Sequence, residues 1–490
     1  MAEILLVTFT ARYSHSAFGL RYLKANLKEL SAKAAIFEFD IRKQPIDSAE
    51  ELLRLCPRIV CFSVHIWNIE QIRATAKLLK QIVPSLKIIV GGPEVSHELE
   101  NEPLVEAADT IVCGEGDLVI AELCQKLLQG ESTEKIIQAE PPDLSKVALP
   151  YDYYSDEDIA HRVTYVETSR GCPFRCAYCM SALDRRVRTF PLATLLPELK
   201  KLMERGARHF KFVDRSFNAL PEHAISVLSF FKDNYVDGLV LHLELVPNKM
   251  SPNLKELLKA FPPGALHIEV GVQTFDEEVG KLVGRPFDSL EVAKTLKFLC
   301  EETKADVHAD LIVGLPGETE ESFGRGFDEL LHFSPGEVQV GILKRLRGAP
   351  LVEKAQEWGL VFSETSPYEV LATKELSFFD VQRLKRFGRY VELLHNRGKL
   401  VATVTKLLEE GSPFEIFSSI NEYFYKRFSR AHDISLENLA KALRDFMVEV
   451  QGCNEAEILK LLRADFARLG RRRLPHWLNE RRIKDGQKSN

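Results

Sequence analysis

Three cysteines, Cys172, Cys176 and Cys179, stand in the order C-x-x-x-C-x-x-C just after a strand-like run, Val163–Glu167. Thiolates are soft ligands that favour iron–sulfur clusters or zinc. Structural zinc needs a fourth protein ligand, and His161, eleven residues upstream of Cys172, lies beyond the strand. Three thiolates leave one iron of a four-iron cluster open. The spacing therefore favours such a cluster, and the alternative is three buried structural cysteines.

The loop from Ser169 to Cys179, with Tyr178 just before the third cysteine, resembles the signature of the radical S-adenosylmethionine (SAM) superfamily. The resemblance implies that SAM chelates the open iron through its amino and carboxylate groups. It also implies that one electron from the cluster cleaves SAM to a 5′-deoxyadenosyl radical. The electron would come from an external donor of the flavodoxin or ferredoxin type.

Composition limits the class of protein that carries this loop. A chain of 490 residues predicts about three domains, and 45% hydrophobic with 28% charged residues is typical of a soluble enzyme. No apolar run reaches the ~18 residues that span a membrane, so we expect a cytoplasmic protein without a membrane partner. Nine cysteines in this length do not form a disulfide framework. The net charge of −6 argues against nucleic-acid binding by the whole surface.

Strand-like and helical runs alternate over residues 1–140, which predicts a parallel sheet flanked by helices. The expected strands are 4–8, 35–39, 59–64, 86–90 and 110–113, and the expected helices are 16–30, 48–55, 68–82, 99–107 and 117–128. Ligands of such sheets bind beyond the carboxyl ends of the strands. Gly114-Glu115-Gly116 is not a dinucleotide fingerprint, because it follows the last strand and Val119 replaces the third glycine.

The layout instead resembles the cobalamin-binding domain that precedes many radical SAM domains, with the segments GGPEVS and CGEGD as its loops. The cobalt-ligating Asp-x-His-x-x-Gly pattern is absent, so the resemblance implies cobalamin bound without that histidine; Asp306-Val307-His308 is the only near match. His65 could ligate cobalt or pack beside it. The alternative is a Rossmann-like domain that has lost its ligand. The residues implied for cobalamin are Thr10, Ser63, His65, Trp67, Gly91, Gly92, Glu94, Gly114, Glu115 and Gly116.

After a linker at residues 141–160, six further strand–helix units predict a partial (β/α)6 barrel over residues 161–350. The expected strands are 163–167, 210–213, 239–244, 267–271, 308–313 and 337–343. Barrel active sites lie at the carboxyl ends of strands, where the cysteine loop stands. Beside the three cluster cysteines, the residues implied for SAM are Tyr178, Asp214, Glu244, Gln273, Gly314 and Pro316. Caps, turns or salt bridges are the alternative role for each.

Residues 351–490 carry amphipathic helical patterns, expected at 381–395, 399–410, 414–429, 435–449 and 455–468, and no chemical motif. We expect a helical C-terminal domain that caps the barrel mouth or receives substrate. Residues 470–490 contain seven basic and two acidic residues, and the basic ones include Arg471-Arg472-Arg473. This patch could meet RNA, although a solvated terminus is the commoner explanation.

The resemblances together imply a cobalamin-dependent radical SAM enzyme that transfers a methyl group to an unactivated carbon or phosphorus centre of an unidentified substrate. The alternatives are a cobalamin-dependent rearrangement, ring contraction or cyclisation, and a non-catalytic iron–sulfur redox sensor. A methylthiotransferase would need a second cluster, for which the N-terminal cysteines show no pattern. For methyl transfer, the loops 63–68 and 91–96 must face the barrel mouth, with Tyr151, Tyr153 and Tyr154 along the seam.

Overall fold

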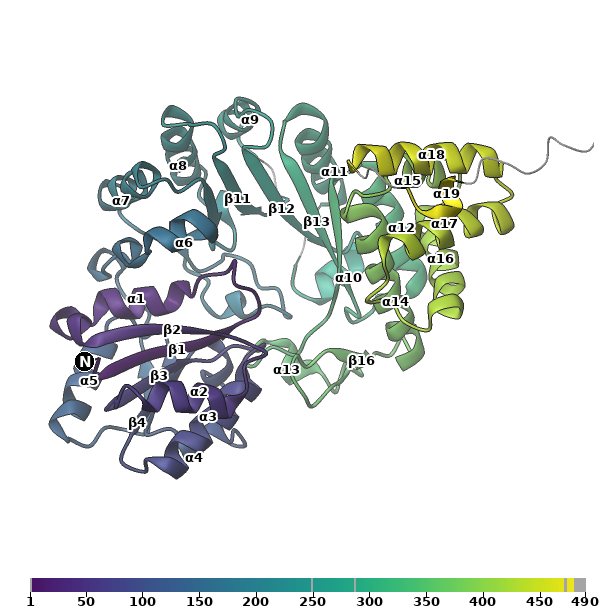
Figure 1. Cartoon of the computed structure of the whole chain (residues 1–490). Helices are drawn as coiled ribbons and strands as arrows, with labels where there is room; N and C mark the ends of the chain where they lie inside the picture. The colour runs from purple at the N-terminus through teal and green to yellow at the C-terminus, as the bar shows by residue number, and fades with distance from the viewer. Residues whose placement is uncertain (1, 248–249, 286–287, 471–473, 480–490) are drawn as a thin grey trace, which may run out of the picture.

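The computed structural model describes residues 2–247, 250–285, 288–470 and 474–479. Two parallel sheets stand at an angle to each other, and a group of helices lies beside the second sheet (Figure 1). The basic patch at 471–473 and most of the C-terminal tail lie outside the described residues. None of the helices in the described part of the chain is long and apolar enough to cross a membrane.

The first sheet has the strand order β2-β1-β3-β4-β5-β6, and all its neighbours pair in parallel. Its strands are β1 Ile4–Thr10, β2 Ala34–Asp40, β3 Ile59–Ser63, β4 Lys87–Gly91, β5 Thr110–Gly114 and β6 Ile136–Ala139. Apolar side chains from both faces pack under helices α1 Phe18–Asn26, α2 Pro45–Leu53, α3 Ile69–Ile82, α4 Leu104–Ala107 and α5 Ile120–Gln129. The expected parallel α/β unit is confirmed.

Two details of this unit differ from the expectation. The edge strand β6 was not expected, because it is short and half of its residues are exposed to solvent. The helix expected at 99–107 forms only over α4, since Pro103 occupies its N-cap and a proline disrupts the interior of a helix.

The second sheet has the order β14-β13-β12-β11-β10-β7, again all parallel. Its strands are β7 Thr164–Val166, β10 His209–Phe212, β11 Val240–Leu245, β12 Leu266–Gln273, β13 Asp306–Val313 and β14 Glu337–Ile342. The helices between them are α7 Leu192–Glu204, α8 Pro221–Asp233, α9 Pro252–Lys259, α10 Glu277–Leu282, α11 Ser289–Lys297 and α12 Glu320–His332. All six expected strands form, and the partial barrel is confirmed.

The C-terminal region is mainly helical, with α13 Leu351–Lys354, α14 Phe378–Val391, α15 Val401–Leu407, α16 Pro413–Phe428, α17 Leu436–Glu449, α18 Glu455–Arg468 and α19 His476–Asn479. A small antiparallel pair, β15 Val361–Phe362 and β16 Val370–Ala372, precedes α14 and was not expected.

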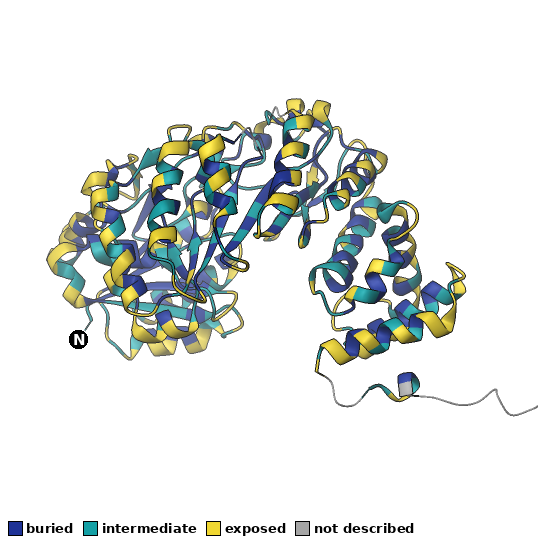
Figure 2. Cartoon of the chain, turned by 90° about the horizontal axis from the view of Figure 1, so that it is seen from above, coloured by how far each residue is buried: buried dark blue, intermediate teal, exposed yellow. Residues whose placement is uncertain are grey.

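The C-terminal helices lie beside the barrel, and a role in capping its mouth or receiving substrate stays a prediction. Helix α14 lies against the open side of the barrel at β14, and the helices after it pack on α14, α12 and one another (Figures 1 and 2). Gly388 of α14 lies against Val340, and the Asn396 amide exchanges two hydrogen bonds with the Val338 backbone, at 2.8 and 2.9 Å. The reason is that β14 is an edge strand whose apolar residues need cover.

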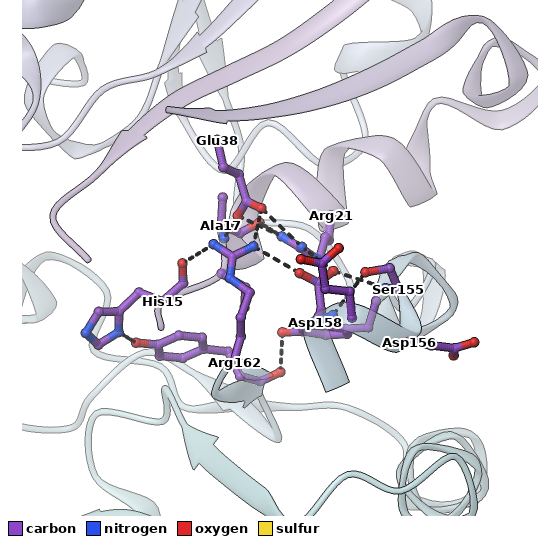
Figure 3. Close-up of polar contacts among 12 residues, drawn as sticks. His15, Ala17, Arg21, Glu38, Ser155, Asp156, Asp158 and Arg162 are labelled. Carbon is purple, nitrogen blue, oxygen red and sulfur yellow. Dashed lines mark hydrogen bonds and ion pairs between the residues drawn. The ribbon is translucent and has the colours of Figure 1, made fainter. Parts of the chain in front are cut away.

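A buried ion-pair network joins the first unit to the linker (Figure 3). Arg21 of α1 contacts Glu38 at 3.0 Å and Asp158 at 2.9 Å, and Arg162 contacts the same two carboxylates at 2.6 and 3.0 Å. Asp158 belongs to α6 Asp156–His161, just before β7. Each charge is paired, so burial does not leave it uncompensated.

The linker tyrosines lie along this seam, as expected. Tyr151 and Tyr154 are buried, the guanidinium carbon of Arg21 lies 4.9 Å from the Tyr154 ring centroid, and the Tyr153 hydroxyl is 2.7 Å from Ser31 Oγ. The linker therefore packs between the two units.

Candidate active site

The cysteine loop is closed at its base by a short antiparallel pair. Strand β8, Ser169–Arg170, pairs with β9, Arg188–Thr189, and the Cys172 amide donates to the Asp184 carbonyl at 2.9 Å. The loop after β7 is thus held at both ends. This fixes where the three thiols stand relative to the barrel.

Gly171 allows this closure. Its φ is +93°, and a Cβ at this position would lie 2.4 Å from the Arg186 carbonyl oxygen. The Ala177 amide also donates to the Val283 carbonyl at 2.7 Å, so the loop is tied to the segment after α10 as well. Only glycine fits position 171 without moving the loop.

The thiols fit a four-iron cluster. Cys172 and Cys176 are buried and Cys179 is half-buried, and burial raises the pKa of the Cys172 thiol. Within the described ranges, no three Cys, His, Asp or Glu side chains are placed to hold a single metal ion. Arg285 Nη1 lies 3.6 Å from Cys176 Sγ and supplies a positive charge beside an anionic cluster.

A cavity of about 1320 Å³, here named the barrel-side cavity, opens from the cysteine loop along β14. Tyr178, Cys179 and Gln273, all expected near SAM or the cluster, line it together with Ile312. Gln273 adopts φ +74° at the end of β12, where the register of β12 against β13 shifts. The structure thus gathers part of the expected SAM set at one end of one cavity.

Three other residues of the SAM set line neither this cavity nor the one described next. Asp214 is buried, and its carboxylate accepts hydrogen bonds from the Thr168 amide, Thr168 Oγ1 and Ser169 Oγ at 2.9, 2.6 and 2.6 Å. Those donors leave it holding the start of the cysteine loop, which argues against ligand contact. Gly314 and Pro316 are buried, and a Cβ on Gly314 would lie 2.6 Å from Val370 of β16.

A second cavity of about 540 Å³, the interdomain cavity, lies between the two sheets. The first unit contributes Thr10, Ser63, His65 and Trp67, all of which were expected near cobalamin. The barrel contributes several polar side chains, among them Lys211, Arg215, His242, Glu244 and Glu269. The carboxyl ends of β1 and β3 therefore face the barrel, as expected for the loop 63–68.

His65 and Trp67 form one wall of the interdomain cavity. Their rings stack with centroids 4.3 Å apart, and the Trp67 side chain is 52% exposed. Burial lowers the pKa of His65 to about 4, so its imidazole is neutral, and Nε2 lies 3.1 Å from Ser63 Oγ. An exposed indole and a neutral polar edge at a cavity fit a large flat cofactor such as a corrinoid.

The glycines of the two loops of the first unit lie close to neighbouring backbone. A Cβ on Gly92 would lie 2.4 Å from the Val64 carbonyl oxygen, and one on Gly114 would lie 2.6 Å from that of Ala139. These glycines are thus explained by contacts between neighbouring strands and not by approach of a ligand. Six of the ten residues expected near cobalamin do not line the interdomain cavity, namely Gly91, Gly92, Glu94, Gly114, Glu115 and Gly116.

Both acids of these loops pair with arginines of the barrel unit. Glu94 lies 2.9 Å from Arg347, after β14. Glu115 lies 2.6 Å from Arg170, which also contacts Asp117 at 2.7 Å. The loop 91–96 therefore faces the barrel, as expected, but it docks the two units.

Apart from Glu244, the polar side chains that line the barrel were not expected from the sequence. His242 contacts Glu269 at 3.0 Å, and His308 contacts Asp310 at 3.1 Å. These residues alternate with buried apolar ones, for example in β12 and β13. A strand buried on both faces is usually continuously apolar. The alternation of polar and apolar residues in these strands could therefore have predicted that one face lines a cavity.

Comparison with protein-family models divides the chain in three. Residues 4–124 match a B12 binding domain, residues 166–330 match the radical SAM superfamily, and residues 356–490 match a family described as a protein of unknown function (DUF4080). The chain thus contains a B12 binding domain followed by a radical SAM domain.

Individual proteins agree with this division. An uncharacterized methyltransferase from Pyrococcus horikoshii is 26% identical over 56% of this chain and 64% of its own length. The cobalamin-dependent radical SAM methyltransferase TokK from Streptomyces tokunonensis is 24% identical over 62% and 50%. The chain therefore spans less than two thirds of either relative.

Among solved structures, the radical SAM methyltransferase TsrM from Kitasatospora setae, with cobalamin and a [4Fe-4S] cluster bound, shares the fold. The TM-score is 0.64 at 15% identity, over 87% of this chain and 99% of TsrM.

Proposed function

We propose that this chain is a cobalamin-dependent radical SAM methyltransferase. The observation that supports this most is that the ends of β1 and β3 open into a cavity whose other wall is the barrel interior. When bound, a reduced cluster with SAM supplies a carbon radical, and a corrinoid supplies a methyl group. A cavity between the two units shields such chemistry from water.

Under this proposal, each group of side chains has its own role. Cys172, Cys176 and Cys179 hold the cluster, and Arg285 offsets its charge. Tyr178 and Gln273 position SAM at the cluster end of the barrel-side cavity. His65 stays neutral and supports Trp67 by stacking, which gives the corrinoid a rigid aromatic surface.

Glu244 is a candidate acid–base group at the proposed corrinoid site. It lines the interdomain cavity, and burial raises its pKa to about 7, against the opposing effect of Arg215. A carboxyl with this pKa exchanges a proton near neutral pH. We propose that the electron donor is a flavodoxin or ferredoxin, and that the protein acts in the cytoplasm.

The test is anaerobic reconstitution of the full chain with iron, sulfide and hydroxocobalamin, followed by gel filtration and incubation with SAM and a reductant. We expect retained corrinoid together with 5′-deoxyadenosine and S-adenosylhomocysteine, because methyl transfer from SAM leaves the latter. Formation of 5′-deoxyadenosine by a protein that retains no corrinoid would reduce the proposal to a radical SAM enzyme of another kind.

A further inference from the structure

The barrel-side cavity has a far wall that neither the cluster nor SAM requires. From Cys179 it extends along β14 to α14 and to the residues just after α16. Its volume of about 1320 Å³ exceeds the roughly 300–1,000 Å³ of a pocket for one small ligand. The cavity therefore has room for a second ligand beside SAM.

The charge of this wall is unusual for the chain. Its basic side chains are Arg12, Lys344, Lys385, Arg386, Arg389, Arg397 and Arg430, and its acidic ones are Asp310, Glu337, Glu369 and Glu392. The whole chain has the opposite balance, with 65 Lys and Arg against 71 Asp and Glu. The positive excess is thus a local feature of the cavity, where low-dielectric walls strengthen its field.

Part of this charge is already compensated. Lys385 pairs with Glu369, and Arg389 and Arg397 both pair with Glu392. For the other four cations, no carboxylate lies within 4.0 Å among the residues that the structure describes. These four are Arg12, Lys344, Arg386 and Arg430.

Arg386 lines the cavity without an ion-pair partner among the described residues and stacks on a tyrosine. Its guanidinium carbon lies 4.2 Å from the centroid of the Tyr425 ring, and its Nε is buried without a hydrogen-bond partner. Stacking uses the face of the guanidinium and leaves its N–H donors in the plane. The helix dipole favours a cation such as Arg430 after the end of α16, but it does not explain Arg386, which lies in the middle of α14.

We infer that the substrate carries an oxyanionic group, a phosphate or a carboxylate, which Arg386 binds together with Arg430. The planar fork of N–H donors matches the paired oxygens of either group. Because the same cavity begins at Cys179, an anion held at its far wall would orient the rest of the ligand toward the cluster. This inference rests on the proposed function for its view that the cavity holds a substrate.

The experiment measures binding of two probe anions, pyrophosphate and citrate, to the full reconstituted chain by calorimetry at low and high salt. The test variant is R386Q/R430Q. The matched control is K426Q/K441Q, which removes two charges from exposed lysines of the same region that do not line the cavity. Melting curves verify that both variants are folded, and an RNA oligonucleotide is titrated in parallel.

We expect one probe to bind the wild-type protein and the control equally, and to bind R386Q/R430Q about tenfold or more weakly. Pyrophosphate alone would indicate a phosphorylated substrate, and citrate alone a carboxylated one. Equal binding to all three proteins, or no binding of either probe, would overturn the inference. The inference would also be overturned if neither anion bound but RNA bound the wild-type protein with sub-micromolar affinity and did not bind R386Q/R430Q. The barrel-side cavity would then bind nucleic acid. SAM cleavage, measured separately, tests the proposed function independently of this result.

Discussion

Gly171 is the residue on which the geometry of the cysteine loop depends most. We predict that Gly171→Ala strongly reduces the iron and sulfide bound per chain, because the new Cβ would lie 2.4 Å from the Arg186 carbonyl oxygen at φ +93°. The control is Gly336→Ala, since the nearest atom to a Cβ there is at 3.6 Å. Normal cluster content in Gly171→Ala would show that the loop tolerates the shift.

Glu318 provides a pH test. It is buried, accepts a hydrogen bond from Thr274 at 2.7 Å, and burial raises its pKa from 4.5 to about 8. Between these values the folded protein binds a proton that the unfolded chain has lost, so the free energy of unfolding falls as the pH rises, by up to ~1.4 kcal/mol per pH unit.

We predict that Glu318→Gln, which cannot ionise, melts at an increasingly higher temperature than the wild-type protein as the pH is raised toward about 8. The measurement is the apparent melting temperature of both proteins across that range. Parallel curves for the two proteins would mean that Glu318 is ionised in the folded state.

Trp67 tests the corrinoid surface. Its side chain is 52% exposed at the edge of the interdomain cavity, so a flat cofactor there would cover it. We predict that Trp67→Ala loses corrinoid during gel filtration, whereas His65→Ala retains it, because His65 is neutral and stacks on the indole without ligating cobalt. Loss of corrinoid from His65→Ala and its retention by Trp67→Ala would indicate that His65 ligates the cobalt.

At the scale of elements, Arg170 connects the base of the cysteine loop to the first sheet. It contacts Glu115, Asp117 and Glu167 at 2.6, 2.7 and 3.0 Å. Burial already raises the pKa of Glu167 to about 7, so loss of the guanidinium would leave buried carboxylates without their cation.

We predict that Arg170→Gln lowers the apparent melting temperature by roughly 5 °C or more and loosens the contact between the two units. The control Arg42→Gln breaks an exposed pair with Asp40 and should shift it by less than about 2 °C. Melting curves and limited proteolysis of the linker report the two effects. Equal shifts in both variants would refute the docking role.

The sequence predicted the elements better than their contacts. The other strands of both sheets were predictable because each is an apolar run between segments with helical periodicity. Strand β6 was not predicted because an exposed edge strand lacks such an apolar run. The cysteine loop was predictable because its ligands are close in sequence. The contacts of Asp214, Glu94 and Glu115 could not be predicted, because their arginine, threonine and serine partners become neighbours only after folding. Their contact with a cofactor stays a prediction.

At the scale of the whole molecule, the two sheets present their carboxyl ends to each other, and the helices flank the open edge of the barrel (Figure 1). The packed linker fixes the angle between the two units. The two cavities open on different sides of the barrel. Methyl transfer by this chain would therefore require both cofactors to act on one substrate.

The measurement that tests this most directly uses SAM labelled with deuterium in its methyl group. The corrinoid-loaded, cluster-containing protein is incubated anaerobically with reductant and cell extract, and mass spectrometry identifies what gains label. The account predicts one labelled compound that is absent when Cys172, Cys176 and Cys179 are all replaced by Ala, and absent without corrinoid. The same labelled compound formed by the triple variant would contradict it.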